Sequence, residues 1–144
     1  MKPIRNCVAL AALLVLCIAW QQGHSKKEIE AGMNRYDRLL EKMDADSIAL
    51  LYAPDGDLGT QAHGRDSIRR FLASFRDVQV LSNKSTTNSI ELTGDSAAQS
   101  GRYHQVAVIN KKDTLSLWGN YTANWIWLRP EGWRIKKMVT HPDQ

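Results

Sequence analysis

Cysteine is nearly absent from this chain of 144 residues, and its two copies, Cys7 and Cys17, lie near the N-terminus. The rest of the chain therefore has neither a disulfide nor a thiol nucleophile, and a packed core must stabilise it. The sequence also lacks a Gly-rich phosphate loop, a Gly-x-Ser-x-Gly elbow and histidines at metal-ligand spacing. We therefore expect no metal and no cofactor.

Long apolar runs are missing too, apart from the segment 7–20, CVALAALLVLCIAW. This segment is shorter than the roughly 20 residues that a transmembrane helix needs. Lys2 and Arg5 precede it, and the small residues Gly23 and Ser25 follow it at spacing typical of a cleavage site. The pattern predicts a signal peptide over 1–25 and a secreted or periplasmic domain over 26–144.

Two alternatives to a cleaved signal peptide stay open. One is an uncleaved N-terminal anchor, and the other is a lipoprotein held in the membrane through Cys17. The second fits less well, because Leu16 is larger than the residue expected before a lipidated cysteine. Contact with a membrane is otherwise not expected.

Neither positive nor negative charge is in large excess in the predicted mature domain. The whole chain has a formal net charge of +4, which falls to +2 when Lys2 and Arg5 are removed with the signal peptide. No cluster of Lys and Arg alternates with exposed aromatic residues along one face. The sequence therefore does not indicate a nucleic-acid partner.

Apolar spacing predicts three helices in the first half of the chain. The first, 26–43, has one apolar stripe, and its carboxylates, including Asp37, are expected on the wet face. Asp44 and Ser47 predict the start of a short second helix that reaches Tyr52. The third covers 65–75, and a short strand over 58–61 is expected before it.

From Asp77 the apolar period changes to two, which predicts strands. The stretch 82–89 is polar and only weakly specified, whereas 97–109 is a clear strand. Turns are expected at 93–95, 110–113 and 129–132. The segment Thr114–Val139 holds four of the five tryptophans and predicts a final aromatic hairpin. The class is α+β, with helices on one face of a curved sheet.

Several short motifs occur in an order that resembles the NTF2-like superfamily, notably the SnoaL-like and DUF4440-type domains and the ketosteroid isomerases. The matching segments are Arg35-Tyr36, 51–55, 64–72, the Trp-Gly and Trp-x-Trp strand, and 132–135. The resemblance implies a cystatin-like cone of three N-terminal helices on a strongly curved antiparallel sheet, with a pocket inside. It also implies dimers formed through the outer sheet face.

The resemblance places Tyr36 where ketosteroid isomerases have the tyrosine that binds a developing oxyanion. It puts Thr60 at the position of the general base, and threonine cannot abstract a proton near neutral pH. Asn124 falls at the second oxyanion donor. The isomerase set is therefore incomplete, and the catalytic candidates are Tyr36 with Asp57 or His63 as acid or base.

Alternation along the aromatic strand separates its side chains into an even and an odd set. The resemblance favours the even set as pocket-facing. The predicted ligand-binding residues are Tyr36, Tyr52, His63, Trp118, Asn120, Asn124 and Trp133. The odd residues Tyr121, Trp125 and Trp127 would then form an outer apolar face for a homodimer. One residue of slip would exchange the two faces.

Three hypotheses of function follow. The first is an exported domain that binds a small, mostly apolar molecule in its cone. The second is a SnoaL-like or ketosteroid-isomerase-like enzyme, which predicts that Asp57 points inward near Tyr36. The third is a structural or interaction module filled by its own tryptophans, which predicts no cavity above about 100 Å³, against roughly 300 Å³ for ordinary ligand sites.

Overall fold

The computed structural model describes residues 23–144, so Cys7, Cys17 and most of the predicted signal peptide lie outside the described residues. The helices and strands, in chain order, are α2 (Lys26–Glu41), α3 (Ala45–Leu51), β1 (Tyr52–Leu58), β2 (Ala62–His63), α4 (Arg65–Ala73), β3 (Val78–Thr93), β4 (Ser96–Ile109), β5 (Asp113–Leu128) and β6 (Gly132–Pro142). Within 23–144 no helix is long and apolar enough to cross a membrane.

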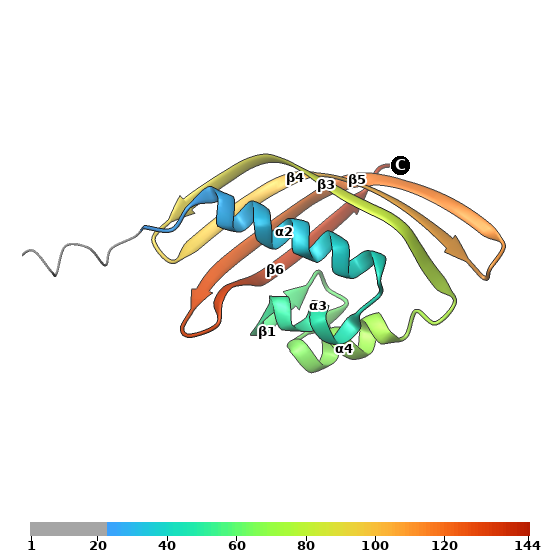
Figure 1. Cartoon of the computed structure of the whole chain (residues 1–144), viewed down its shortest axis with the longest axis horizontal. Helices are drawn as coiled ribbons and strands as arrows, with labels where there is room; N and C mark the ends of the chain where they lie inside the picture. Colours follow the sequence, from blue (N-terminus) through green and yellow to red (C-terminus); the bar gives the residue numbers. More distant parts are fainter. Residues whose placement is uncertain (1–22) are drawn as a thin grey trace, which may run out of the picture.

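The six strands form one sheet in the order β2-β1-β6-β5-β4-β3. The sheet bends around α2, which lies along its concave side, while α3 and α4 sit beside β1 (Figure 1). This confirms the predicted α+β cone. The sheet is mixed rather than wholly antiparallel, because β1 runs parallel to β6, with Tyr52 beside Ile135 and Leu58 beside Met138.

The predicted helices and the three predicted hairpin turns are present, with small differences at the ends of helices. Asp44 caps α3 by accepting a hydrogen bond from the backbone N–H of Ser47 at 3.0 Å. The expected strand over 58–61 is wrong: the chain is already extended from Tyr52, and Gly59, with a φ of +55°, starts the turn after β1. The polar stretch 82–89 is part of the long strand β3.

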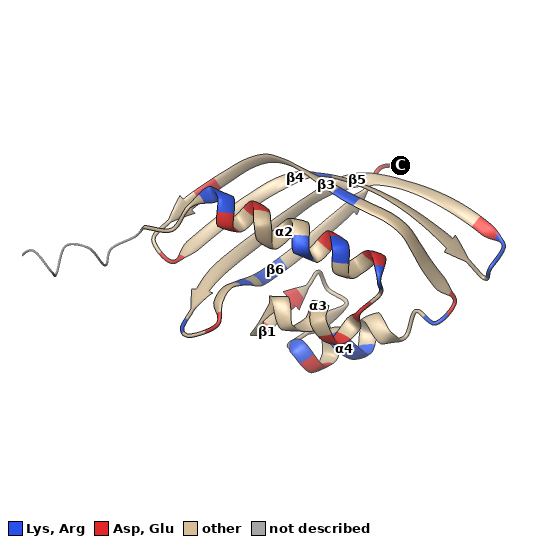
Figure 2. Ribbon diagram, in the orientation of Figure 1, with Lys and Arg blue, Asp and Glu red and all other residues tan. Residues whose placement is uncertain are grey.

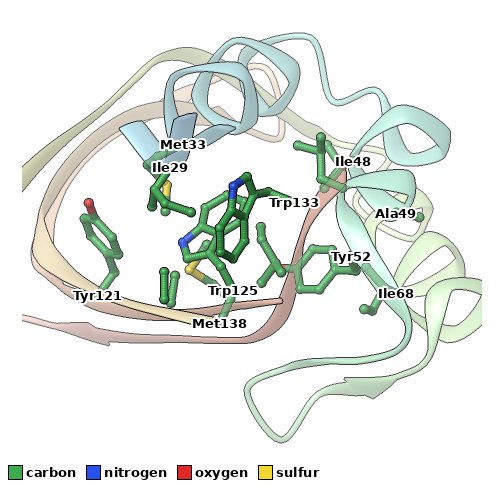
Figure 3. Packing of buried hydrophobic residues seen from close by; sticks show 14 of the residues in the cluster. Ile29, Met33, Ile48, Ala49, Tyr52, Ile68, Tyr121, Trp125, Trp133 and Met138 are labelled. Carbon is green, nitrogen blue, oxygen red and sulfur yellow. The ribbon is translucent and has the colours of Figure 1, made fainter. Parts of the chain in front are cut away.

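The core is made by the odd residues of β5 together with α2, β1 and β6. Tyr121 is 2% exposed and Trp125 is 3% exposed, and both point into the space under α2 (Figure 3). Trp118 on the other face is 52% exposed. The predicted assignment of faces is therefore wrong. The concave face is covered by a helix and takes the apolar set, so the amide and hydroxyl side chains of β5 face water.

The same finding corrects the predicted dimer face. Tyr121 and Trp125 lie in the core, and Trp127 is half-buried against Trp133, at 5.7 Å between ring centroids. Side chains that are already packed inside the cone cannot form an outer apolar surface.

The folded unit begins slightly before the expected domain start at Lys26. The ring of His24 packs on Trp127 and Trp133 at centroid distances of 4.3 and 4.8 Å, and its Nε2 lies 3.0 Å from Asp95. The backbone N–H of Ser25 donates to Glu28 at 2.7 Å, which caps α2. His24 and Ser25 therefore belong to the domain.

Helix α2 lies close to the sheet at Gly32. A Cβ placed on this glycine would lie 2.9 Å from Cη2 of Trp125, and the Trp125 ring is fixed by its own hydrogen bond to Gln99. The absence of a side chain at position 32 therefore allows the helix to lie directly on the indole.

We expect Gly32→Val to lower the free energy of unfolding by about 1–3 kcal/mol, because the added atoms overlap a ring that cannot move aside. Urea denaturation measures the difference. Asn34→Val is the matched control, since it introduces the same β-branched residue on the exposed side of α2. Equal stability of the two variants would show that the close contact with Trp125 is wrong.

Candidate functional site

A cavity of about 300 Å³ lies between α2, α4 and the concave face of the sheet. Its lining residues are Met33, Tyr36, Leu40, Leu58, Gln61, Phe71, Leu72, Phe75, Asn83, Ser85, Tyr103, Gln105, Tyr121, Met138 and Thr140. About half of them are apolar and the rest are neutral hydrogen-bonding groups. The cavity is therefore an apolar space with several convergent polar groups, as in small-molecule sites.

The three tyrosines of the lining present neutral hydroxyl groups. Burial raises the pKa of Tyr36, Tyr103 and Tyr121 above the ordinary value for a phenol. Each hydroxyl therefore keeps its proton near neutral pH and can donate a hydrogen bond. Tyr36, the predicted oxyanion donor, does line the cavity.

A buried carboxylate stands behind one wall of the cavity. Asp37 is 7% exposed, and its oxygens accept hydrogen bonds from Nδ2 of Asn83 at 2.7 Å and from the N–H and Oγ of Ser85, both at 2.8 Å. The prediction that Asp37 lies on the wet face is wrong. It falls four residues after Met33 and three before Leu40, which puts it on the buried side of the helix.

The chain of hydrogen bonds continues from Asp37 along the sheet. Nε2 of Gln105 on β4 donates to Oδ1 of Asn83 on β3 at 3.1 Å. Glu41, one turn after Asp37, accepts from the backbone N–H of Asn83 at 3.0 Å. These bonds explain why a polar stretch forms a strand: its inward side chains find hydrogen-bond partners on α2 and β4.

A second polar chain crosses the core near the tryptophans. The indole N–H of Trp125 donates to Oε1 of Gln99 at 3.0 Å, and Nε2 of Gln99 donates to the hydroxyl of Thr87 at 2.9 Å. Since an indole nitrogen can only donate, it fixes which end of the Gln99 amide faces it. The buried Gln99 is therefore held in one orientation.

Tyr52 and Trp133, both predicted ligand-binding residues, are buried beside the cavity rather than in its lining. Tyr52 packs edge-on to Tyr36 with 6.4 Å between centroids, and burial raises its pKa well above 10. Within the described residues, the buried indole N–H of Trp133 has no hydrogen-bond partner. Trp133 fills the concave face nearer the β5–β6 turn, with Trp127.

Asp57 and His63, the candidate acid and base, are brought together but outside the cavity. They face each other across the β1–β2 pair, with Nδ1 of His63 2.6 Å from Oδ1 of Asp57. The His63 side chain is 74% exposed, and neither residue is part of the cavity lining. The expectation that Asp57 points inward beside Tyr36 is therefore wrong.

The even residues of β5 lie on the convex, solvent-facing side of the sheet. Trp118, Asn120 and Asn124 are exposed, and the Trp118 ring stacks on His104 at 3.9 Å between centroids. The prediction that these three residues line the cone is wrong for the reason given above: the concave face takes the apolar set. Thr60, at the position of the isomerase base, is also exposed and outside the lining.

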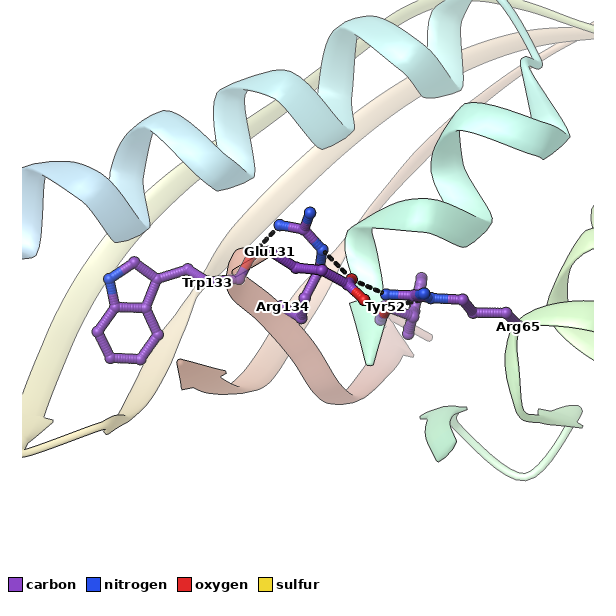
Figure 4. Close-up of polar contacts among 5 residues, drawn as sticks. All are labelled: Tyr52, Arg65, Glu131, Trp133 and Arg134. Carbon is purple, nitrogen blue, oxygen red and sulfur yellow. Dashed lines mark hydrogen bonds and ion pairs between the residues drawn. The ribbon is translucent and has the colours of Figure 1, made fainter. Parts of the chain in front are cut away.

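The helical side of the cone is tied to the β5–β6 turn by a network centred on Glu131. Its carboxylate binds Arg65 at the start of α4 and accepts from Nε of Arg134 at 3.2 Å (Figure 4). Nε of Arg65 also donates to the backbone oxygen of Tyr52 at 2.8 Å. The hydrogen bond from Arg65 lowers the pKa of Glu131, so the pair stays ionised near neutral pH. This network anchors the start of α4, the helix that carries Phe71 into the cavity lining.

The sequence prediction missed most of the polar cavity wall. Asn83 and Ser85 lie in the stretch that was only weakly specified, and Gln105 and Tyr103 lie in a strand whose faces were not assigned. The position of Asp37 within the apolar stripe of α2 was the available signal. A carboxylate on a buried helical face requires donors opposite it, and polar strand residues supply them.

Three comparisons bear on the identity of the fold. The model of the SnoaL-like domain family matches residues 21–139. A ketosteroid isomerase-like protein from Erwinia carotovora atroseptica aligns with a TM-score of 0.71 at 15% identity, over 81% of this chain and 94% of that one. An NTF2-like superfamily protein from Salmonella enterica serovar Typhimurium aligns with a TM-score of 0.69 at 20% identity, over 83% and 91%.

A third solved structure, from Catenulispora acidiphila, was determined in complex with S-DNPA. It aligns with a TM-score of 0.65 at 14% identity, over 81% of this chain and 92% of that one. Comparison with curated proteins finds no match. The family match spans most of the chain, so this protein belongs to the SnoaL-like domain family and has the NTF2-like fold.

The titration of Asp37 gives a test of the buried network. Burial raises the pKa of Asp37, and the hydrogen bonds from Ser85 and Asn83 oppose that rise only in part. The folded state therefore holds this proton more tightly than the unfolded chain, in which an aspartate titrates near about 4. The Asp37 contribution to stability is most favourable below the unfolded pKa and declines as pH rises through the raised folded pKa.

We expect the stability of the wild type relative to Asp37→Asn to fall as pH rises from about 4. Urea denaturation at each pH measures the difference. Glu41→Gln keeps Asp37, so its stability relative to Asp37→Asn should fall with pH as that of the wild type does. A difference that stays constant or grows with pH would mean that Asp37 is not the buried acid described above.

Proposed function

We propose that this protein binds a small, neutral, mostly apolar molecule in the cavity under α2. The observation that supports this is the cavity itself: about 300 Å³ with an apolar lining and neutral polar groups. This volume is at the lower end of the range for small-molecule sites. The interaction-module hypothesis required a much smaller space, because it needed the tryptophans to fill the cone.

Charge also favours a neutral ligand. None of the lining residues among 23–144 carries a charge, and charges of both signs alternate on the outer sides of α2 and α4 (Figure 2). An ionised ligand would lose its hydration inside the cavity without meeting an opposite charge. A neutral molecule with one or two hydrogen-bonding groups loses much less.

Binding is favoured over isomerase chemistry by the residues around the cavity. Proton abstraction needs a base within hydrogen-bond reach of the substrate, and the lining contains neither a carboxylate nor a histidine. Asp37 is behind the wall, and all its acceptor contacts are with Asn83 and Ser85. Tyr36 would act as a donor that orients the ligand.

One observation favours a second candidate, an enzyme that uses His63 as acid or base. The close contact of Asp57 with Nδ1 of His63 would orient the ring and leave Nε2 exposed. The substrate would then lie on the outer side of β1 and β2 rather than in the cavity. We rank this candidate second because the His63 side chain is 74% exposed, and the hollow that it lines with Arg65 and Asp66 is open to water rather than closed against it.

The binding proposal extends to cellular location. The predicted signal peptide over 1–25 combines a basic start, Lys2 and Arg5, with a short apolar run over 7–20, and we propose export on that basis. The contacts of His24 with Trp127 and Trp133 suggest that processing removes residues before His24 and leaves this side chain in place.

The solved relative in complex with S-DNPA supports the view that this fold can hold a small molecule.

Leu40→Trp is the variant that tests the cavity, because Leu40 lines it from α2 and an indole would occupy much of its volume. Native mass spectrometry of gently purified protein should show a small adduct that disappears on denaturation. We expect the wild type to carry the adduct and Leu40→Trp to lose at least about 90% of it.

Leu50→Trp is the control, since Leu50 is 59% exposed on α3 and is not part of the cavity lining. It should retain the adduct as the wild type does. An adduct that survives in Leu40→Trp would place the ligand elsewhere. No adduct in the wild type, together with no thermal shift on adding naphthalene-sized alcohols or ketones, would contradict the proposal.

A homodimer also remains a proposal, now through the convex face. Trp118 is half exposed there and stacks on His104, which makes it the largest exposed apolar group of β5. An exposed tryptophan is a common anchor of protein interfaces. We expect sedimentation equilibrium to give a dimer that Trp118→Ser weakens at least tenfold, with Asn124→Ser as control. A monomeric wild type would overturn this proposal.

A further inference from the structure

The hydrogen bonds around Asp37 have a fixed direction. An ionised carboxylate can only accept hydrogen bonds, and Asp37 receives three, from Nδ2 of Asn83 and from the N–H and Oγ of Ser85. A protonated carboxyl group would turn a hydrogen toward one of these donors, so the arrangement fits the ionised form. Asp37 thus fixes the orientation of the Asn83 and Ser85 side chains, because their donor atoms must face the carboxylate. Their acceptor atoms therefore face away from it.

The orientation of these hydrogen bonds determines which atoms of two other side chains face the cavity. Nδ2 of Asn83 faces Asp37, so Oδ1 of Asn83 faces Gln105 and must be met by Nε2 of Gln105, at 3.1 Å. This leaves Oε1 as the free end of the Gln105 amide. Ser85 uses its only hydroxyl hydrogen on Asp37, so toward the cavity its oxygen can only accept.

Gln105 and Ser85 both line the cavity, on neighbouring strands. Asn83 also lines this wall and keeps one amide hydrogen, but it is only 5% exposed, whereas Ser85 and Gln105 are half-buried and present more of their surface. No group among residues 23–144 donates a hydrogen bond to Oε1 of Gln105. This wall of the cavity therefore presents two hydrogen-bond acceptors, Oε1 of Gln105 and Oγ of Ser85. The buried carboxylate of Asp37 fixes the orientation of both.

We propose that Gln105 and Ser85 select ligands that carry a hydroxyl or N–H donor, and that Asp37 is the positioning residue for both. This inference rests on the proposed function and specifies the class of ligand: a mostly apolar alcohol, phenol or uncharged N–H compound rather than an ether or ester of the same shape. A ligand without a donor leaves the amide oxygen of Gln105 with neither water nor a hydrogen-bond partner. Such an unpaired buried acceptor lowers the binding affinity.

The structure also defines how the preference can be reversed. In Asp37→Asn the new side chain must turn its oxygen to the backbone N–H of Ser85, which cannot rotate. Its NH2 group then faces Asn83 and Oγ of Ser85, where the carboxylate accepted before. The Asn83 and Gln105 amides must flip, so Gln105 presents its NH2 group to the cavity and Ser85 its hydroxyl hydrogen.

Equilibrium dialysis with matched probes measures this directly. The probes are 1- and 2-naphthol and their methyl ethers, which differ in whether they can donate. For the wild type we expect at least one naphthol to bind about fivefold more tightly than its ether, the effect of one neutral hydrogen bond. In Asp37→Asn the ratio should fall to about one, because the ether now meets donors.

Glu41→Gln is the matched control. Glu41 lies one turn further along α2 and accepts from the backbone N–H of Asn83, which glutamine can also do, so the ratio should stay near five. Gln105→Met is the second variant if Asp37→Asn does not fold, which circular dichroism detects. It keeps the shape of the wall, removes the amide acceptor, and should bring the ratio down toward one.

The outcomes separate the two proposals. Equal binding of naphthols and ethers by the wild type, blocked by Leu40→Trp, would overturn the donor preference and leave the cavity proposal intact. A fivefold ratio that persists in Asp37→Asn would overturn the role of Asp37. Failure of all four probes to bind the wild type would contradict the cavity proposal, and the donor preference with it.

Discussion

The structure depends on the way α2 is held on the concave side of the sheet. Two contacts of different kinds fix it. Gly32 permits the helix backbone to lie on the ring of Trp125, and five residues further on Asp37 accepts hydrogen bonds from Asn83 and Ser85 on the sheet. Apolar packing alone would tolerate a small sliding of the helix, whereas a buried carboxylate with three donors specifies one position. The cavity is the space that this position leaves open.

The sequence was a good guide to the fold. The apolar stripe of α2, the acidic start of α3 and the hairpin turns each have a local physical cause, and each occurs where the pattern predicted it. The parallel pairing of β1 with β6 was not predictable in this way. This pairing places Tyr52 beside Ile135. The pattern of residues within one strand does not indicate which distant strand will pair with it.

The site was much harder to predict. Alternation along β5 correctly divided its side chains into two sets, but nothing in the strand itself says which set faces the helix. The polar set was assigned to the pocket because a ligand needs polar groups, yet the structure supplies these from β3 and β4, through Asn83, Ser85 and Gln105. Tyr36 was located correctly because it lies in the apolar stripe of a helix, where the buried side is evident. Asp37, its neighbour, shares that side.

The parallel contact of β1 with β6 also has a consequence for the order of folding. Every helix of the described chain lies before residue 74, whereas the strands on which α2 packs come after it. During synthesis Gly32 of α2 has no indole to pack on until β5 is made. In the same way β1 gains its main neighbour only when β6, the last strand of the described chain, is complete. Contacts this far apart in sequence form slowly and leave apolar surface exposed in the meantime. The described domain is thus one that completes its fold only once β6 has been made, so its helical half cannot reach its final packing ahead of the strands.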